Sequence, residues 1–242
     1  MKQDIYIFGA GGLGKETVCL LQDLPQYNVV AFVDKDDITR TSVVANGIRF
    51  PIISEMAFEK RCMEDRRVCA VIAIGKPGPR FSVAQRFGDL CLFPNIIHPS
   101  VDFVGQVSLG RGNLIAHHCF FTDNIQIGDF NYFNVFNYVG HDVVIGSYNS
   151  ILPSCNISGC VTVGNRNLIG AQAFIIEGKH VGNGNSIGAG SVVLKPIEVV
   201  PHGLACLPRK SCEFYNLINN KKFKSSCIFL NGLLDSLNAC SL

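Results

Sequence analysis

The stretch "IGSYNSILPSCNISGCVTVGNRNLIGAQAFI" (145–175) has an apolar residue at every sixth position: Ile145, Ile151, Ile157, Val163, Ile169 and Ile175. The same step continues in both directions without a break, from Ile97 to Val199. Neither the 3.6-residue period of a helix nor the two-residue period of an ordinary strand selects one residue in six. Hexapeptide repeats are typical of a parallel β-helix.

A second period of eighteen residues indicates that three hexapeptides make one coil. The segments "LGRGN" (109–113), "IGDFN" (127–131), "IGSYN" (145–149), "VGNRN" (163–167) and "VGNGN" (181–185) align at this spacing. They form a glycine column (Gly110, Gly128, Gly146, Gly164, Gly182) and an asparagine column (Asn113, Asn131, Asn149, Asn167, Asn185). We expect three-sided coils with glycine and asparagine at corners of positive φ, and asparagine side chains bonded in a ladder.

The composition is that of a soluble globular protein. The chain has 242 residues, 48% hydrophobic and 17% charged, which is enough for one large or two smaller domains. A net charge of +2 gives no electrostatic basis for binding nucleic acid or a membrane surface, and no apolar run is long enough to cross a bilayer. Eleven cysteines without CxxC pairs or a signal peptide predict reduced thiols in the cytoplasm.

The N-terminal segment predicts a small α/β unit. "IYIFGAGGLGKETVCLL" (5–21) indicates a strand, a glycine turn and a helix, and "VVAFVDKDD" (29–37) indicates a second strand ending at Asp34. "VCAVIAIGKPGPR" (68–80) indicates a third strand that runs into a loop with Lys76 and Arg80. The glycine turn fits phosphates over a helix N-terminus. The unit ends near residue 92, too early for a full NAD domain, which favours a nucleotide-sugar cradle over NAD-dependent redox chemistry.

His141 is the candidate general base. On an eighteen-residue coil its neighbours above and below are Asp123 and Gly159, and Gly159 leaves an open slot beside the imidazole. The adjacent Asp142 could orient the ring, so the pair fits proton removal from a bound nucleophile. The alternative is a solvated corner residue, because the chain has five other histidines: His98, His117, His118, His180 and His202.

Both halves together resemble the bacterial sugar acetyltransferases that modify nucleotide-activated amino sugars, including the sialic-acid acetyltransferase branch. The resemblance covers residues 4–209 and rests on "GAGGLGKE", "FVDKDD", "AIGKPGPR", "NIIHPSV", "GHDVVIG" and "IGAGSVV". It implies a Rossmann-like nucleotide-sugar-binding half-domain (1–92), a left-handed parallel β-helix (93–200) and a C-terminal extension (201–242).

The resemblance also implies the reaction. We expect direct N-acetylation of a nucleotide-linked amino (dideoxy) sugar by acetyl-CoA in glycan or surface-polysaccharide biosynthesis, with no metal and no acyl-enzyme. His141 is expected to act as the base and Asp142 to assist it. The family implies a homotrimer with CoA between adjacent β-helices.

Further site residues follow from the family, position by position. Asn134 matches an asparagine at the substrate amine, and Asp34 an aspartate at the nucleotide base. The remaining substrate-site residues are Gly11, Gly12, Leu13, Gly14 and Lys76. The residues expected at CoA are Ser150, Gly159, Ala189 and Pro208.

Three positions depart from the family pattern. Leu13 stands where the glycine turn usually has a histidine, and Ser150 stands where a second histidine is common. The closing motif around Pro208 reads "CLPRK" (206–210). These departures bear on the identity of the substrate more than on the type of reaction.

Two rival functions remain at this stage. One is O-acetylation of a sugar such as sialic acid, in which the same base would activate a hydroxyl. The other is a non-catalytic nucleotide-sugar-binding scaffold. The tail "SCEFYNLINNKKFKSSCIFLNGLLDSLNACSL" (211–242) is expected to pack on a neighbouring subunit, with a surface segment or a CoA-phosphate contact as alternatives.

Overall fold

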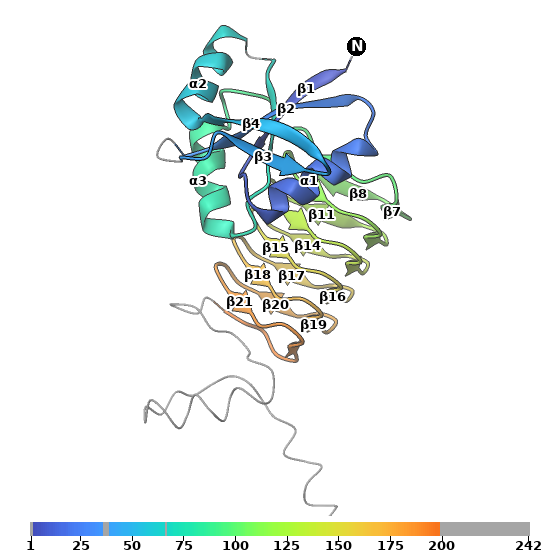
Figure 1. Cartoon of the computed structure of the whole chain (residues 1–242). Coiled ribbons are helices and arrows are strands. Elements are labelled where there is room, and N and C mark those ends of the chain that lie inside the picture. The colour runs from blue at the N-terminus through green and yellow to red at the C-terminus, as the bar shows by residue number, and fades with distance from the viewer. Residues whose placement is uncertain (1, 36–38, 66, 199–242) are drawn as a thin grey trace, which may run out of the picture.

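The computed structural model describes residues 2–35, 39–65 and 67–198. An α/β unit lies at one end of a long stack of short strands (Figure 1). Pro208 and the expected C-terminal extension lie outside the described residues. Among the helices of the described part, none is long and apolar enough to cross a membrane.

The α/β unit is a five-stranded sheet covered by three helices. Its elements are β1 (Gln3–Phe8), α1 (Gly12–Gln22), β2 (Tyr27–Asp34), β3 (Ser42–Ala45), β4 (Ile48–Ser54), α2 (Glu55–Glu64), β5 (Cys69–Ile72) and α3 (Pro77–Phe87). The strand order is β3-β4-β2-β1-β5, and the strands run parallel except for the β3–β4 pair. The carboxyl ends of β1 and β2 therefore meet at the glycine turn, as the strand–turn–helix pattern predicts.

The strand predicted from residues 68–80 is β5, and it runs into a short loop that includes Lys76, as expected, but the loop is followed by helix α3, so Arg80 lies in a helix and not in the predicted loop. Helix α3 begins at Pro77, and the side chain of Arg80 is buried on its inner face. Proline is favoured in the first turn of a helix because its fixed φ suits that turn and its missing N–H has no partner to lose there. The "PGPR" segment therefore starts a helix.

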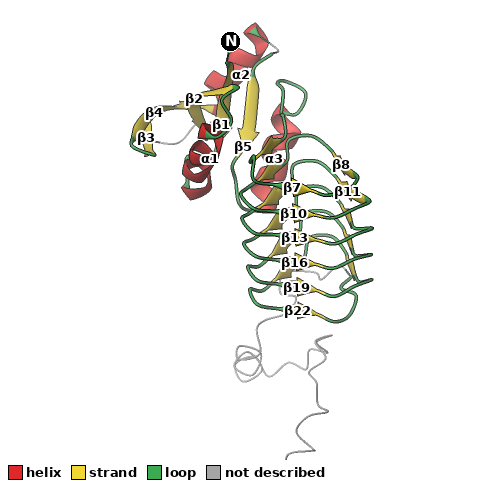
Figure 2. Cartoon of the chain, turned by 90° about the vertical axis from the view of Figure 1, so that its right-hand side faces the viewer, coloured by secondary structure: helices red, strands yellow, loops and turns green. Residues whose placement is uncertain are grey.

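The remaining strands build a three-sided parallel β-helix, as the six- and eighteen-residue periods predict, and it is left-handed, as the family resemblance implies. Each strand pairs in parallel with the strand eighteen residues away, for example Tyr132 with Ser150 (Figure 2). One sheet contains β6 (Ile96–Ile97), β9 (Leu114–Ile115), β12 (Tyr132–Phe133), β15 (Ser150–Ile151), β18 (Leu168–Ile169) and β21 (Ser186–Ile187). The second contains β7 (Asp102–Phe103), β10 (Phe120–Phe121), β13 (Tyr138–Val139), β16 (Asn156–Ile157), β19 (Phe174–Ile175) and β22 (Val192–Val193). The third contains β8 (Val107–Leu109), β11 (Ile125–Ile127), β14 (Val144–Ile145), β17 (Thr162–Val163) and β20 (His180–Val181).

The sixth-residue positions form the interior of the stack. From Ile115 to Val193 every one of them is buried. Phe103, which lies in the first coil, is 38% exposed because no complete coil covers it from above. Burial of these side chains at about 25 cal/mol per Å² of apolar surface is the main stabilisation of the β-helix.

The asparagine column is a buried hydrogen-bonded ladder, as predicted. The Asn131 side-chain oxygen accepts from the Asn149 backbone N–H at 2.9 Å and from the Asn149 side-chain amide at 3.0 Å. The Asn149 oxygen accepts from Asn167 in the same way. Each of these asparagines therefore links its own coil to the next coil by hydrogen bonds.

The expectation of positive φ at the glycine and asparagine columns is wrong. The left-handed residues form three other columns, six residues apart, which include Tyr148 (φ 64°), Ser154 (φ 60°) and Cys160 (φ 58°). Gly146 has no positive φ, but a Cβ there would lie 2.8 Å from the Gly164 carbonyl oxygen. The glycine column therefore exists because successive coils stack too closely for a side chain.

A buried arginine joins the two units. Arg80 is 1% exposed, and its guanidinium donates to the Asn149 carbonyl at 2.9 Å and to the Ser150 hydroxyl at 2.8 Å, both on the β-helix. It also donates to the Ile74 carbonyl at 3.0 Å, on the loop after β5. The Ser150 hydroxyl donates in turn to the Gly75 carbonyl at 2.6 Å. Burial lowers the pKa of Arg80 to about 9, and no described carboxylate pairs with it.

We predict that Arg80→Lys lowers the free energy of unfolding by about 2 kcal/mol or more, because an ammonium cannot reach this spread of carbonyl oxygens and leaves some unpaired. The matched control is Arg86→Lys on the same helix, where Arg86 is half-exposed and pairs with Glu55 and Glu59. That change should cost less than about 1 kcal/mol. Urea denaturation followed by circular dichroism measures both, and equal small losses would contradict this role of Arg80.

Candidate functional site

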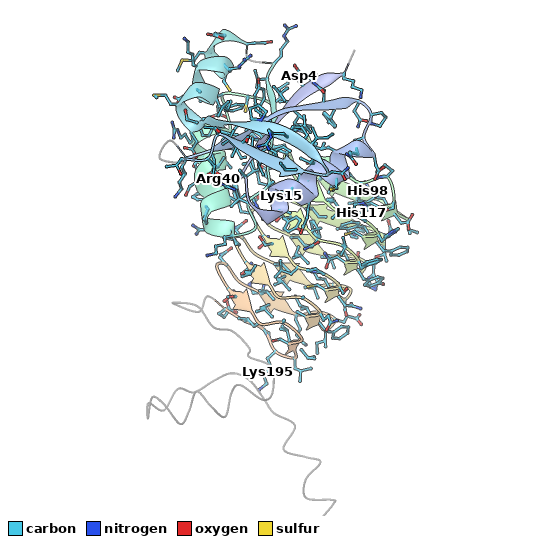
Figure 3. The ribbon with its side chains drawn as sticks, viewed as in Figure 1. Asp4, Lys15, Arg40, His98, His117 and Lys195 are labelled. Atoms are coloured by element: carbon cyan, nitrogen blue, oxygen red, sulfur yellow. The ribbon has the colours of Figure 1, made fainter. Side chains whose placement is uncertain are left out.

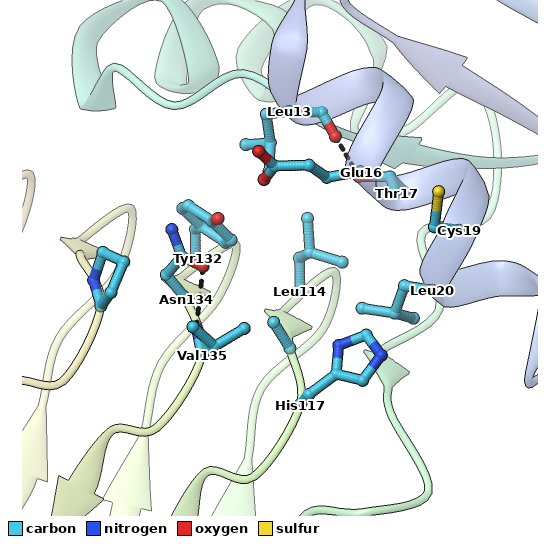
Figure 4. A pocket seen from close by; sticks show the side chains of 12 residues that line it. Leu13, Glu16, Thr17, Cys19, Leu20, Leu114, His117, Tyr132, Asn134 and Val135 are labelled. Carbon is cyan, nitrogen blue, oxygen red and sulfur yellow. Dashed lines mark hydrogen bonds between the residues drawn. The ribbon is translucent and has the colours of Figure 1, made fainter. Parts of the chain in front are cut away.

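A cavity of about 390 Å³ lies between α1 and the first coils of the β-helix. Two of the predicted substrate-site residues, Leu13 and Asn134, line it from opposite sides (Figure 4). The full lining is Leu13, Glu16, Thr17, Cys19, Leu20, Leu114, Ala116, His117, Tyr132, Asn134, Val135 and Pro153. Most of these side chains are apolar, which is usual for a small-molecule site with a few orienting polar groups.

One face of α1 forms the upper wall. Leu13, Glu16, Thr17 and Leu20 follow the spacing of three and four residues that places side chains on a single helix face. The Thr17 hydroxyl donates to the Leu13 carbonyl at 2.8 Å and is therefore occupied within the helix. Glu16 is the one carboxylate among the lining residues.

The outer face of the β6–β21 sheet forms the lower wall. Burial raises the pKa of the Tyr132 phenol, and the Glu16 carboxylate across the cavity raises it further. The Asn134 side-chain oxygen accepts from the Val135 N–H at 2.8 Å. The NH₂ group of Asn134 has no partner among the described residues, so it is free to donate to a ligand.

The glycine turn lies at the N-terminus of α1. Gly11 is the N-cap and Gly12 the first helical residue, and both are exposed. A Cβ on Gly14 would overlap the Gly9 carbonyl oxygen, so glycine is required there for the helix to pack against the turn. The Asp34 carboxylate accepts from the Ala10 N–H at 3.2 Å and thus borders the turn.

Three basic side chains lie near the glycine turn or near the end of β5: Arg40, Lys15 and Lys76. Arg40, which the sequence analysis did not select, donates to the Ala10 carbonyl at 3.3 Å. Lys15 lies in the first turn of α1 and is exposed. The predicted Lys76 is exposed at the N-terminus of α3, beyond the end of β5, which pairs with β1.

His141 and Asp142 form a hydrogen-bonded pair at an exposed corner between β13 and β14. His141 Nδ1 lies 2.7 Å from Asp142 Oδ2, and the side chains are 57% and 49% exposed. This hydrogen bond to Asp142 raises the pKa of His141. The Asn124 amide donates to the other Asp142 oxygen at 2.6 Å and, together with His141, lowers the pKa of Asp142. The Asp142 carboxylate is therefore held ionised from both sides.

Gly159 lies directly against the imidazole, so the expected open slot is filled by the ring itself. A Cβ on Gly159 would lie 2.6 Å from His141 Nε2 and 2.7 Å from Cε1. Adjacent coils are separated by strand spacing, which is just enough for a flat ring over a backbone. The Gly159 backbone therefore covers part of the imidazole, and a substrate can reach only the part of the ring that is exposed to solvent.

The residues expected at CoA are dispersed. Ser150 is fully buried between Arg80 and Gly75, so the structure corrects its assignment: no surface of Ser150 is left for a cofactor. Ala189 is exposed and belongs to the same corner column as Val135 and Pro153 of the cavity, at multiples of eighteen residues. Pro208 lies outside the described residues.

A single chain does not bring Asn134 and His141 together. Asn134 precedes β13 and His141 follows it, so the two lie at different corners of the same coil. The outer face of the β7–β22 sheet separates these corners. The cavity and the histidine–aspartate pair are therefore two separate places on one chain.

Two groups of described side chains have donor atoms close enough to share a metal ion: Asp23, His98 and His117, and His141, Asp142 and Cys160. In the first group the His98 ring stacks on His117 at 3.6 Å (Figure 3). The Ser100 N–H donates to His98 Nδ1 at 3.1 Å, so His98 Nε2 carries the hydrogen and donates to Asp23. That nitrogen has no lone pair for a metal, and the group is a structural link between α1 and the first coil.

Sequence reasoning missed Glu16, His117 and Tyr132 as cavity residues. Glu16 had a detectable signal, because it follows Leu13 by three residues on a predicted helix. His117 and Tyr132 belong to different coils and reach the cavity only because the α/β unit packs on that sheet. No local pattern in the sequence specifies this packing.

Comparisons with known proteins identify relatives of both units. The sequence profile of the PglD N-terminal domain family matches residues 4–87. GDP-perosamine N-acetyltransferase of Escherichia coli O157:H7 is 30% identical over 161 residues, which cover 63% of this chain and 69% of that protein.

Solved structures extend the similarity to 81–82% of the chain. A histidine-to-asparagine variant of perosamine N-acetyltransferase from Caulobacter crescentus, in complex with CoA and GDP-perosamine, superposes with a TM-score of 0.72 at 27% identity, covering 81% of this chain and 90% of that one. The acetyltransferase domain of PglB from Neisseria gonorrhoeae, in complex with acetyl coenzyme A, gives 0.71 at 25% identity, with 82% and 94% covered. The chain belongs to the hexapeptide-repeat family of sugar N-acetyltransferases.

Proposed function

We propose that this protein transfers the acetyl group of acetyl-CoA to the amino group of a nucleotide-linked amino sugar, in the cytoplasm and as a step of bacterial glycan biosynthesis. The observation that carries the proposal is the exposed His141, held by Asp142 and resting on Gly159. Relatives of similar fold bind CoA together with GDP-perosamine, which supports N-acetylation over O-acetylation of sialic acid and over a scaffold without catalysis.

The nucleotide would bind at the glycine turn. The exposed backbone of Gly11 and Gly12 at the N-terminus of α1 suits a diphosphate, because helix N-termini attract anions. Asp34 borders the same turn and would contact the base. The sugar would then extend into the cavity, where the free NH₂ of Asn134 donates to it.

The chemistry is direct acyl transfer. The neutral amine attacks the thioester carbonyl carbon, the C–N bond forms, and His141 Nε2 takes the proton from nitrogen. Asp142 stabilises the resulting imidazolium, and the Gly159 N–H would stabilise the oxyanion. The tetrahedral intermediate then breaks its C–S bond, and the CoA thiolate takes the proton from His141. General-base assistance of this kind contributes ~10²–10⁴ in rate.

The proposed assembly is a homotrimer in which neighbouring chains complete each site. The cavity and His141 lie at different corners, so one substrate reaches both only when they come from adjacent subunits. The face between those corners is apolar and uncovered: Phe120 is 37% exposed, Tyr138 39% and Val192 52%. Exposed apolar patches of this kind mark protein contact surfaces.

The reaction is tested by following free CoA thiol release from acetyl-CoA with UDP-, dTDP-, GDP- and CMP-linked amino sugars and with free sialic acid. We expect release with a nucleotide-linked amino sugar and a loss of at least about 10²-fold in kcat for His141→Ala. Release with sialic acid alone would indicate O-acetylation. Equal rates for the wild type and the variant would remove His141 as the base.

The role of Asp142 predicts a shift of pH dependence. The hydrogen bond to Asp142 raises the pKa of His141, and a general base must be neutral, so activity should fall as the pH drops through that pKa. In Asp142→Asn the pKa of His141 should decrease and the acid limb of the profile should move to lower pH. NMR titration of the imidazole measures this shift, with Asp123→Asn on the neighbouring coil as the control that leaves it in place. An unchanged pKa in Asp142→Asn would contradict the pairing.

The shared site predicts complementation between inactive chains. Asn134→Ala and His141→Ala should each be inactive as pure proteins, but co-expression should produce mixed trimers in which some sites have both native residues. Recovery of about a tenth or more of the wild-type activity is expected, together with a mass three times that of the chain by light scattering. A monomer, or no recovery from a confirmed mixed assembly, would place both residues in one chain's site.

A further inference from the structure

Glu16 is the one carboxylate among the residues that line the cavity, and the proposed reaction gives it no role. It is exposed on the α1 face that forms the upper wall, and Figure 4 shows it above Tyr132 on the side of the cavity where Asn134 lies. Among the described residues it makes no hydrogen bond and no ion pair. The chain thus presents an unpaired anion to a space whose other walls are mostly apolar side chains.

The surroundings of Glu16 favour a cationic or hydrogen-donating occupant. Leu13, Leu114 and Val135 line the same cavity and offer a ligand no polar contact. The Glu16 carboxylate is exposed at the wall of this cavity, and a ligand that displaces water from the apolar side chains would place an ammonium group where this charge attracts it, or a carboxylate where the charge repels it. The free NH₂ of Asn134 supplies a donor beside it but no charge.

The order of charges along α1 matches one class of ligand. The helix N-terminus at Gly11 and Gly12 is electropositive, and Lys15 and Arg40 add two cations near it. Glu16 follows about one helical turn further on and reverses the sign. A molecule with a diphosphate at one end and an ammonium-bearing ring at the other would meet the cations at the turn and the anion at Glu16, while the Asp34 carboxylate at the turn is left for the nucleotide base.

We infer that Glu16 is the specificity residue for the amine: its carboxylate binds the ammonium form of the amino sugar and disfavours anionic sugars. This inference rests on the proposed function and adds to it a reason for N- over O-acetylation. A sugar acid such as sialic acid would bring a second carboxylate into the cavity. The bound ammonium loses one proton to solvent, and the resulting amine loses the second to His141 as the C–N bond forms.

The test compares wild type, Glu16→Gln and Glu64→Gln by titration calorimetry and steady-state kinetics. Glu64 is an exposed carboxylate at the end of α2, outside the cavity lining, so it is the matched control for loss of one negative charge. The probes are GDP-perosamine, or the amino sugar that proves active in the nucleotide-sugar panel, and the same nucleotide sugar with a hydroxyl in place of the amine.

For Glu16→Gln we expect the Kd and KM of the amino sugar to rise about tenfold or more, equivalent to about 1.4 kcal/mol. The kcat, the KM of acetyl-CoA and the Kd of the hydroxyl analogue should stay within about twofold, and Glu64→Gln should match the wild type. A merely structural role would weaken both ligands equally.

An equal loss for amine and hydroxyl ligands, or no loss for the amine, would overturn the role of Glu16 while leaving the reaction intact. Absence of binding and of CoA release with every amino sugar would instead overturn the proposed function, and this inference with it. The two failures are therefore distinguishable.

Discussion

The eighteen-residue register is the constraint on which the rest of the structure depends. Every coil must repeat at this length so that the asparagine ladder, the glycine column and the sixth-residue core all stay aligned. Because the register is fixed, His141 necessarily lies over Gly159, and Asp142 necessarily lies under Asn124. The repeat that builds the scaffold thus also sets the geometry of the histidine–aspartate pair, with no dedicated loop.

The second determinant is the packing of the α/β unit on one face of the β-helix. Arg80 and Ser150 bond the loop after β5 to that face, at the cost of burying a guanidinium that no carboxylate of the described residues pairs with. Neutral carbonyl and hydroxyl acceptors offset that cost in part. With the units fixed in this way, α1 closes over the first coils and forms the cavity. The contacts that hold the two units together therefore also form the walls of the cavity.

Much of the fold was predictable because it is periodic. The hexapeptide step identified the core, and the eighteen-residue alignment identified the strand partners. Corner geometry was not predictable in the same way, because left-handed φ values fall on residues such as Tyr148 and Cys160, whose side chains give no hint of them. Ser150 was misassigned for a different reason: its burial comes from another domain, which no spacing within the repeat reveals.

The measurement that tests the central claim most directly is the chemical identity of the new bond in the product. A nucleotide-linked amino sugar would be incubated with acetyl-CoA and the enzyme, and the product would be analysed by NMR and treated with hydroxylamine. Acyl transfer to nitrogen predicts an amide N–H coupled to a sugar proton and an acetyl group that resists hydroxylamine. An acetyl group that hydroxylamine removes would be an ester and would contradict the account.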